Sequence, residues 1–163
     1  MKNKTLLLVY VPFLICLLMA CTFPIANPNQ ETNQDWVVLA TGNQCAVENS
    51  QQIVLKSEEA FNKFWEETFS GFDMPPTQAS VDFNNRWVVA AFMGMQRKGG
   101  FSAEVISLTE KEQSTEILLQ HLKPGPDCMS TMAIEFPFLI VSIKKPSSEE
   151  ISFQVMEKVY TCE

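Results

Sequence analysis

The second half of the chain is a series of apolar runs separated by turns of a few residues. Residues 88–93 are almost continuously apolar, as in a strand that is buried on both faces. The runs that follow are "FSAEVISLT", "STEILLQHLK", "MSTMAIEFPFLIVSIKK" and "ISFQVMEKVY". Short turns favour antiparallel neighbours, because parallel strands need long crossovers. We therefore expect a mainly antiparallel sheet built as a meander, a sandwich or a barrel-like structure. Pro137 cannot donate to a ladder, so its strand should bend or lie at an edge there.

The first half of the domain adds two strands and a helix. "DWVVLAT" and "QQIVLK" are short runs rich in valine, leucine and isoleucine, and both are typical of strands. Ser57 stands as an N-cap before two glutamates, and large apolar side chains then recur at helical spacing. The sequence predicts one long amphipathic helix over residues 57–69, packed against the sheet, and the fold class is α+β.

The N-terminus indicates export. Lys2 and Lys4 precede an unbroken apolar segment over residues 6–19, which is somewhat short for a spanning helix. The ending "LLMAC" resembles the lipobox of bacterial lipoproteins, after which the signal is cut and Cys21 carries the lipid. Alternatives are an ordinary signal peptide or an uncut anchor. We expect lipidation at Cys21, with the mature protein held on a bacterial membrane, outside the cytoplasm, in the cell envelope.

The chain then divides into a spacer and one domain. Residues 1–20 form the expected signal peptide, and residues 21–35 form a lipidated N-terminus and flexible linker rich in proline, asparagine and glutamine. Residues 36–163 have the size of one ordinary domain. No internal repeat interrupts it.

Charge excludes one class of partner. Without Lys2 and Lys4, ten cations face 19 carboxylates, so the mature chain is near −9. Nucleic-acid binding requires a basic face, and Arg97 with Lys98 forms only a small island. We therefore expect no nucleic-acid partner.

Two glycine-containing loops, residues 96–100 and residues 123–128, should lie at the same end of a meander, and they carry the candidate binding residues. The second loop is made rigid by its prolines, and its Asp127 is a possible partner for a charged group. Rigid neighbouring loops often present a binding surface, although glycine and proline also make plain turns. The candidate residues are Gln96, Arg97, Lys98, Gly99 and Gly100 in the first loop, and Pro124, Gly125, Pro126 and Asp127 in the second, which spans residues 123–128.

These same residues carry a resemblance to a known family. "VDFNNRWVVAAFMGMQRKGGFSAEVISL" followed by "LKPGPDCMSTMAIEFPFLIVSIKK" resembles the C-terminal domain of the PrcB family, non-catalytic subunits associated with a secreted protease complex. The similarity extends over residues 53–145. It implies a secreted or lipid-anchored binding module that stabilises an associated protein.

Catalytic and metal sites are not expected. The chain has one histidine, His121, inside a predicted strand, and a Cys–His pair would require Cys128 to meet it across a Pro-Gly-Pro turn. Asp82 and Asp127 could form a carboxylate pair, but Asp82 more plausibly caps a turn. The remaining cysteines are far apart in the sequence, and the chain has no second histidine to complete a set of metal ligands. We therefore expect no metal site and no cofactor. The protein is predicted not to be an enzyme.

Three cysteines remain after the signal and the lipidated residue, in an oxidising compartment. One disulfide and one leftover thiol is the simplest outcome. The meander brings the end of the last strand beside the second loop, so Cys128 with Cys162 is the expected pair. Cys45 with Cys162 is the alternative.

Three functions follow from these features. The first is an accessory or stabilising subunit of an envelope or secreted complex, whose partner is an exported protein, a protease by the resemblance. The second is a protease inhibitor that uses the two loops as a wedge. The third is a structural lipoprotein of the envelope.

Overall fold

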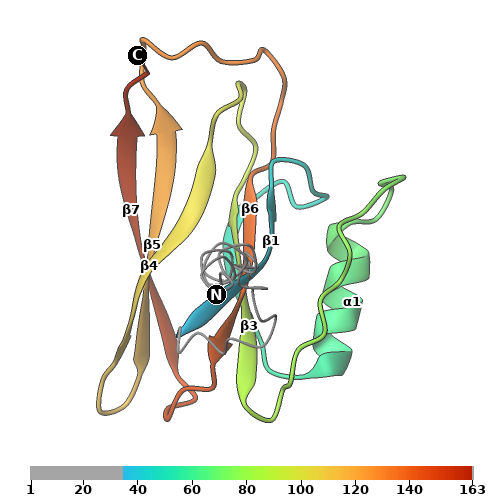
Figure 1. Cartoon of the computed structure of the whole chain (residues 1–163), viewed down its shortest axis with the longest axis vertical. Coiled ribbons are helices and arrows are strands. Elements are labelled where there is room, and N and C mark those ends of the chain that lie inside the picture. Colours follow the sequence, from blue (N-terminus) through green and yellow to red (C-terminus); the bar gives the residue numbers. More distant parts are fainter. Residues whose placement is uncertain (1–34, 163) are drawn as a thin grey trace, which may run out of the picture. The chain divides into compact units, whose positions relative to one another are not determined.

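The computed structural model describes residues 35–162 (Figure 1). The predicted signal peptide, the lipidation site Cys21 and the linker up to residue 34 lie outside the described residues. Within the described part, no helix is both long enough and apolar enough to cross a membrane.

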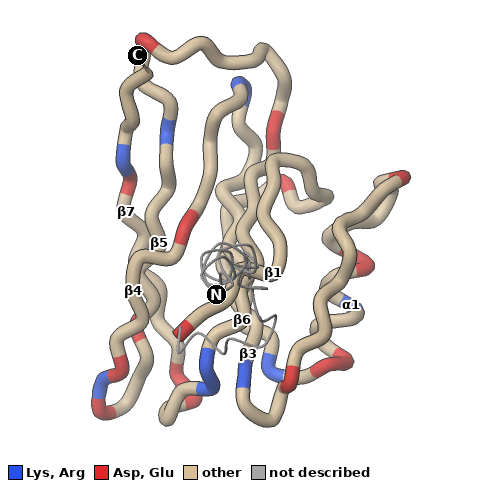
Figure 2. The backbone as a smooth tube through the Cα atoms, viewed as in Figure 1, with Lys and Arg blue, Asp and Glu red and all other residues tan. Residues whose placement is uncertain are grey.

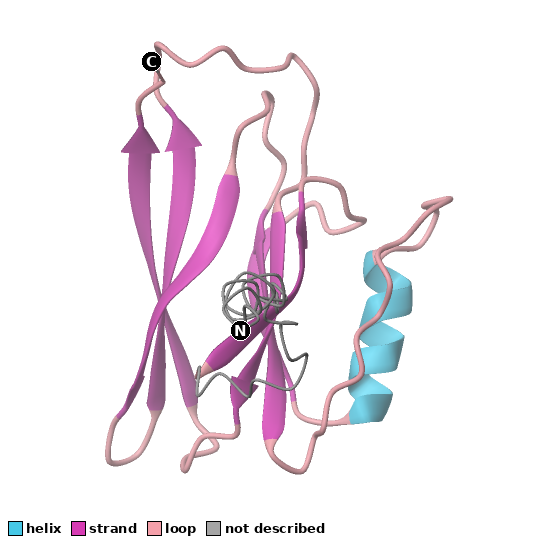
Figure 3. Ribbon diagram, viewed as in Figure 1, coloured by secondary structure: helices cyan, strands magenta, loops and turns pink. Residues whose placement is uncertain are grey.

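Two sheets and one helix make up the domain (Figure 3). The four-stranded sheet has the order β1-β6-β3-β2 and is antiparallel throughout. The three-stranded sheet has the order β4-β5-β7, with β4 antiparallel and β7 parallel to β5. The elements are β1 Trp36–Gly42, β2 Ser50–Leu55, α1 Glu58–Thr68, β3 Arg86–Met93, β4 Ser102–Glu110, β5 Thr115–Pro124, β6 Phe138–Lys144 and β7 Ile151–Tyr160.

The four-stranded sheet is the middle layer of three. Along β3, alternate side chains point to opposite faces. Val88, Ala90 and Phe92 pack in one buried cluster with the aromatic side chains of α1. Trp87 and Val89 pack in a second cluster with residues of β4, β5 and β7. The continuous apolar run therefore corresponds to a strand with two buried faces.

The helix is shorter than predicted. It spans 11 residues, Glu58–Thr68, and Ser57 and Phe69 are its caps. The Ser57 hydroxyl accepts from the Ala60 N–H at 3.3 Å, as an N-cap does. Its buried face consists of Phe61, Phe64, Trp65 and Thr68. The prediction of an amphipathic helix at this place holds, but the prediction of a long one was wrong, because three turns suffice to cover the sheet.

The meander was also wrong, and the domain is not a closed barrel. Of the second-half strands, consecutive pairing joins only β4 to β5, while β3 and β6 lie in the other sheet. The physical reason is burial: β3 and β6 are apolar on both faces and belong in the middle layer, whereas β4 has one exposed face. The expected strand from residue 129 begins only at Phe138, after Pro137, and β6 is an inner strand.

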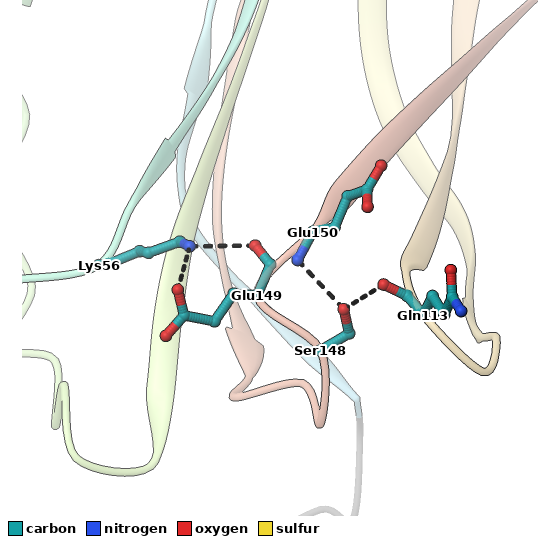
Figure 4. A network of polar contacts seen from close by, with 5 residues as sticks. All are labelled: Lys56, Gln113, Ser148, Glu149 and Glu150. Atoms are coloured by element: carbon teal, nitrogen blue, oxygen red, sulfur yellow. Dashed lines mark hydrogen bonds and ion pairs between the residues drawn. The ribbon is translucent and has the colours of Figure 1, made fainter.

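A polar network ties both sheets together where the chain passes from β6 to β7 (Figure 4). Lys56 Nζ donates to the Glu149 carbonyl at 3.0 Å and lies 4.3 Å from the centroid of the Trp87 ring. The Ser148 hydroxyl donates to the Gln113 carbonyl and accepts from the Glu150 N–H at 3.2 Å. We call this end, with residues 111–114 and 145–150, the crossover end. The opposite end, with residues 94–101, 125–137 and 161–162, is the loop end.

Candidate binding surface

The loop between β3 and β4 is fixed to the segment that precedes β6. Gln96 and Glu135 form an isolated antiparallel bridge, with the Gln96 N–H donating to the Glu135 carbonyl at 2.7 Å and the reverse bond at 2.9 Å. The Gly99 N–H donates to the Thr131 carbonyl at 3.0 Å. We call residues 129–137 the strap, because they connect the tip of the three-stranded sheet to β6 across the loop end (Figure 1).

The two glycines of "QRKGG" are required by close neighbours as well as by the turn. A Cβ on buried Gly99 would collide with Thr131 Oγ1 and lie 2.6 Å from Glu135 Oε1. Gly100 has a φ of 97°, and a Cβ there would lie 2.9 Å from the Tyr160 hydroxyl. Both distances are shorter than real Cβ contacts. The glycines therefore let this loop lie directly against the strap and the end of β7.

The second loop is tied to the end of β7. The Gly125 N–H donates to the Tyr160 carbonyl at 2.9 Å, and Asp127 Oδ2 accepts from the Cys162 N–H at 2.9 Å. A disulfide joins Cys128 and Cys162, whose Cα atoms are 5.0 Å apart. Asp127, expected as a partner for a cation, thus has a backbone N–H as its partner. Pro124 and Gly125 are buried, while Pro126 is exposed.

The two predicted loops lie side by side. The Tyr160 hydroxyl donates to the Gly100 carbonyl at 2.8 Å, and the Cβ position of Gly100 is 3.4 Å from Pro124. The one consecutive pair that remains of the expected meander explains this proximity. β4 and β5 pair antiparallel, which brings the start of β4 beside the end of β5.

Two unpaired cations of the described chain lie at the tip of the loop end of this acidic domain. Arg97 and Lys98 are exposed and form no ion pair or side-chain hydrogen bond among residues 35–162. Lys123 pairs with Glu157 of β7. Figure 2 shows blue segments at the tip of the β3–β4 loop and on the upper parts of β5 and β7. The free cations at the tip can therefore meet an anionic group of another molecule.

The strap adds exposed apolar side chains that the sequence reading missed. Met129 and Met132 are almost fully exposed, and Ile134 is about half exposed, as is Met95 in the neighbouring β3–β4 loop. The three strap residues were assigned to a strand because apolar residues in a run are typical of one. Pro137 could have shown that the strand begins only after it, since a proline cannot donate to a sheet and often precedes the first paired residue of a strand.

The catalytic candidates are not brought together. Cys128 is disulfide-bonded, so it has no thiol to pair with His121. His121 is buried in β5, and this burial lowers its pKa, more than the nearby Glu157 raises it. Asp82 lies before β3, at the opposite end of that strand from the loop that contains Gln96. Hydrogen bonds from the Asn85 side chain and the Asn84 N–H lower the Asp82 pKa, as in a capped turn.

Cys45 is the free thiol of the described chain, and it is buried. Its Sγ donates to the Phe136 carbonyl at 3.4 Å, and burial raises its pKa. A buried thiol with a raised pKa has little thiolate and is inert as a nucleophile. Among the described residues, no group of three or more His, Cys, Asp or Glu side chains could hold a metal ion.

Comparison with known proteins finds a family model that is similar to the part of the chain containing these loops. Neither curated proteins nor solved structures gave a match. A family model described as PrcB C-terminal matches residues 87–144, from the start of β3 to the end of β6. This interval contains both loops and the strap. The resemblance read from the sequence is thereby confirmed over this part of the chain.

Proposed function

We propose that this chain is an exported, lipid-anchored accessory subunit that binds another exported protein with its loop end. The family points to a domain that accompanies a protease complex and has no catalytic role of its own. The anchor is Cys21, and residues 22–35 are the spacer that keeps the domain clear of the membrane. The partner is an envelope or secreted protein, a protease by the family.

One observation carries this proposal. At the loop end, the backbone of both loops is fixed by hydrogen bonds, close glycine contacts and a disulfide, while Arg97, Lys98 and the strap methionines remain exposed. A rigid scaffold that presents exposed apolar and charged side chains loses little conformational entropy on binding. Flexible methionines suit a contact surface of irregular shape.

The binding test uses two matched double variants. Arg97→Ala with Lys98→Ala removes the cations at the loop end, and Lys144→Ala with Lys145→Ala removes two adjacent exposed lysines at the crossover end. Exposed cations contribute little to folding, so both variants should melt with the parent. Crosslinking in the native envelope should identify the partner. The first variant should bind that partner more weakly, and the second should bind like the parent. Equal binding by all three proteins would refute the loop-end surface.

Partner activity decides between an accessory subunit and an inhibitor. If the partner is a protease, an accessory subunit keeps or raises its activity, whereas a loop wedge in the active-site cleft lowers it. Anchoring is tested separately by Cys21→Ser. That variant should lose lipid labelling and leave the membrane fraction, and unchanged detergent partitioning would contradict lipidation.

A further inference from the structure

The two sheets have four edge strands, and β7 differs from the other three. A free strand edge can pair with another chain, and proteins commonly protect it with a bulge or a short, polar strand. β1 and β4 each carry a register shift, between Val38 and Ala40 and between Val105 and Ser107. β2 is regular but only six residues long, and it begins with "SQQ". β7 is ten residues long, and its register with β5 is unbroken from end to end.

The backbone of β7 leaves one set of residues free to pair. At its two ends, the carbonyls of Glu150 and Tyr160 accept from β5 and from the residue that follows it. In a strand, the N–H and C=O of one residue point to the same side, and successive residues alternate. Even-numbered residues therefore face β5, and odd-numbered residues face the open edge. In the half nearer the loop end, these are Val155, Glu157 and Val159.

This half of β7 also exposes apolar side chains on both faces. Val155 is 44% exposed and Val159 is 61% exposed on the side of the second core cluster, and Met156 is 43% exposed on the other side. An added strand would cover these side chains as well as pair with the backbone. Apolar cross-strand contacts of this kind stabilise sheet pairing.

The charges on this edge select the added strand. Glu157 is paired with Lys123, and the hydrogen bond from Lys123, together with its charge, lowers the Glu157 pKa. Lys158 is exposed and has no ion-pair partner among the described residues. The edge ends at Tyr160, which is hydrogen-bonded to Gly100 in the loop that carries Arg97 and Lys98. The unpaired charges along this line are positive, so they complement a segment that carries carboxylates.

We propose that β7 is a strand-addition site that receives an extended segment of a partner protein as a fourth strand of the three-stranded sheet. The segment has apolar side chains at alternate positions and a carboxylate opposite Lys158. β-Strand addition gains affinity from backbone hydrogen bonds and specificity from side-chain contacts. The inference rests on the proposed function, because the segment that pairs with β7 belongs to the same exported partner.

The first test uses a synthetic extended peptide of alternating valine and threonine with one central glutamate. Hydrogen exchange at single residues is followed on the full chain. Binding should slow exchange of the Val155, Glu157 and Val159 amides, which face the open edge. The amides of Gln154, Met156 and Lys158 are already bonded to β5 and should change little. Slowed exchange elsewhere, or none in β7, would overturn the proposal.

Matched proline variants separate pairing from folding. Val155→Pro removes an N–H that faces the open edge, where proline is tolerated, so it should melt like the parent and bind the peptide about tenfold more weakly. Met156→Pro removes an N–H that bonds β5, so it should unfold at lower temperature. Undiminished peptide binding by Val155→Pro would refute strand addition. If that variant fails to fold, Val159→Pro makes the same comparison.

Charge exchange tests whether a carboxylate of the bound segment lies opposite Lys158. Lys158→Glu should weaken binding of the glutamate peptide about fivefold, and a peptide with lysine in place of glutamate should restore it. Lys63→Glu on α1, also exposed, is the control and should leave binding unchanged. Sedimentation of the protein alone tests whether β7 pairs with a second copy of the chain. If the parent self-associates and Val155→Pro does not, β7 pairs with a second copy, which contradicts the proposal.

The results for β7 and for the loops remain separable. If Arg97→Ala with Lys98→Ala leaves partner binding intact but Val155→Pro abolishes it, the loop-end surface fails and the strand-addition site stands. The reverse result leaves the proposed function standing and removes the strand-addition site.

Discussion

The two ends of the sandwich are closed in different ways. At the crossover end, exposed polar side chains add to the backbone bonds: Lys56 reaches Glu149, and Ser148 joins the β4–β5 turn to the chain that enters β7. At the loop end, a disulfide joins Cys128 to Cys162, and close backbone packing joins Gly99 to Thr131. Side chains that hold a structure together are not free to bind, and Arg97 and Lys98 take no part in the links of the loop end.

The same contrast appears in exposure. The crossover end has charges that pair with one another, such as Lys111 with Glu116, and two exposed lysines, Lys144 and Lys145, but no exposed methionine among its residues 111–114 and 145–150. The loop end exposes the unpaired cations Arg97 and Lys98 together with the methionines of the strap. Breaking the loop end should therefore cost stability through backbone and covalent constraints, whereas breaking the crossover end should cost little.

The largest effect is expected from the disulfide. Replacing Cys128 and Cys162 together with alanine opens a link between residues 34 apart in the sequence. Loss of a cross-link of this span should lower the free energy of unfolding by about 2–4 kcal/mol. Urea denaturation of the parent and the variant measures this difference. Identical midpoints would show that the hydrogen bonds hold the second loop without the disulfide.

A smaller effect is expected from Gly99→Ala. The added Cβ would collide with Thr131 Oγ1 and approach Glu135 Oε1, so the strap must shift. Overpacking of this kind should cost about 1–3 kcal/mol. Adding Thr131→Ala removes one of the two obstacles and should recover part of the loss, because neighbouring changes are not additive. Thermal melting of the two single variants and the double variant tests this coupling. Additive losses would mean that Gly99 and Thr131 do not share the space.

The third prediction concerns acid. His121 lies in the half of β5 nearer the loop end, 7% exposed, and its Nε2 has no hydrogen-bond partner in the described structure. Burial lowers its pKa below the ordinary value of 6.5, so the unfolded chain binds the proton more readily. This contribution to stability is present above pH 6.5 and is lost as the pH falls through the lowered pKa.

Chemical denaturation at a series of pH values checks this sign. The parent should lose stability as the pH falls below 6.5. His121→Leu, which has no group to protonate, should lose less over the same range. Glu157, whose pKa Lys123 lowers, contributes stability that is present above its ordinary value of 4.5 and is lost as the pH falls below that value, so it affects a more acidic range. Parallel curves for parent and variant above pH 4.5 would exclude His121 as the cause.

Local chemistry allowed the elements to be predicted, but not how they pair. The Ser57 cap, the helical spacing of aromatic residues and the continuous apolar run of β3 each report on a few neighbouring residues. Sheet membership depends on distant contacts: β5 pairs with β7 in parallel, and β6 leaves its sequence neighbours to join β1 and β3. A run of apolar letters does not specify these partners.

The candidate site shows the same limit. The loops were found from their glycines, prolines and cations, because those residues mark turns and exposed charge. The strap was not found, since Met129, Met132 and Ile134 are apolar and exposed, against the usual correlation of apolar with buried. The open edge of β7 was equally hidden, because an edge is defined by the strand that is missing beside it. The signal peptide and the lipid at Cys21 stay predictions.

The smallest effect is expected at the crossover end, from Lys56→Met. The methionine keeps an apolar stem over Trp87 but loses the bond to the Glu149 carbonyl, the contact with its carboxylate at 3.8 Å and the cation over the ring. The Lys56 and Glu149 side chains are 43% and 92% exposed, so water replaces most of what is lost. We expect a decrease of at most about 1 kcal/mol in the free energy of unfolding, measured by urea denaturation beside the disulfide variant. Ser148→Ala, which removes the neighbouring link to Gln113, is the companion variant and should cost a similar amount. If either change cost as much as the disulfide, the crossover end would be a structural constraint equal to the loop end. The contrast between an end held by a disulfide and close backbone packing and an end held by exposed polar contacts would then fail.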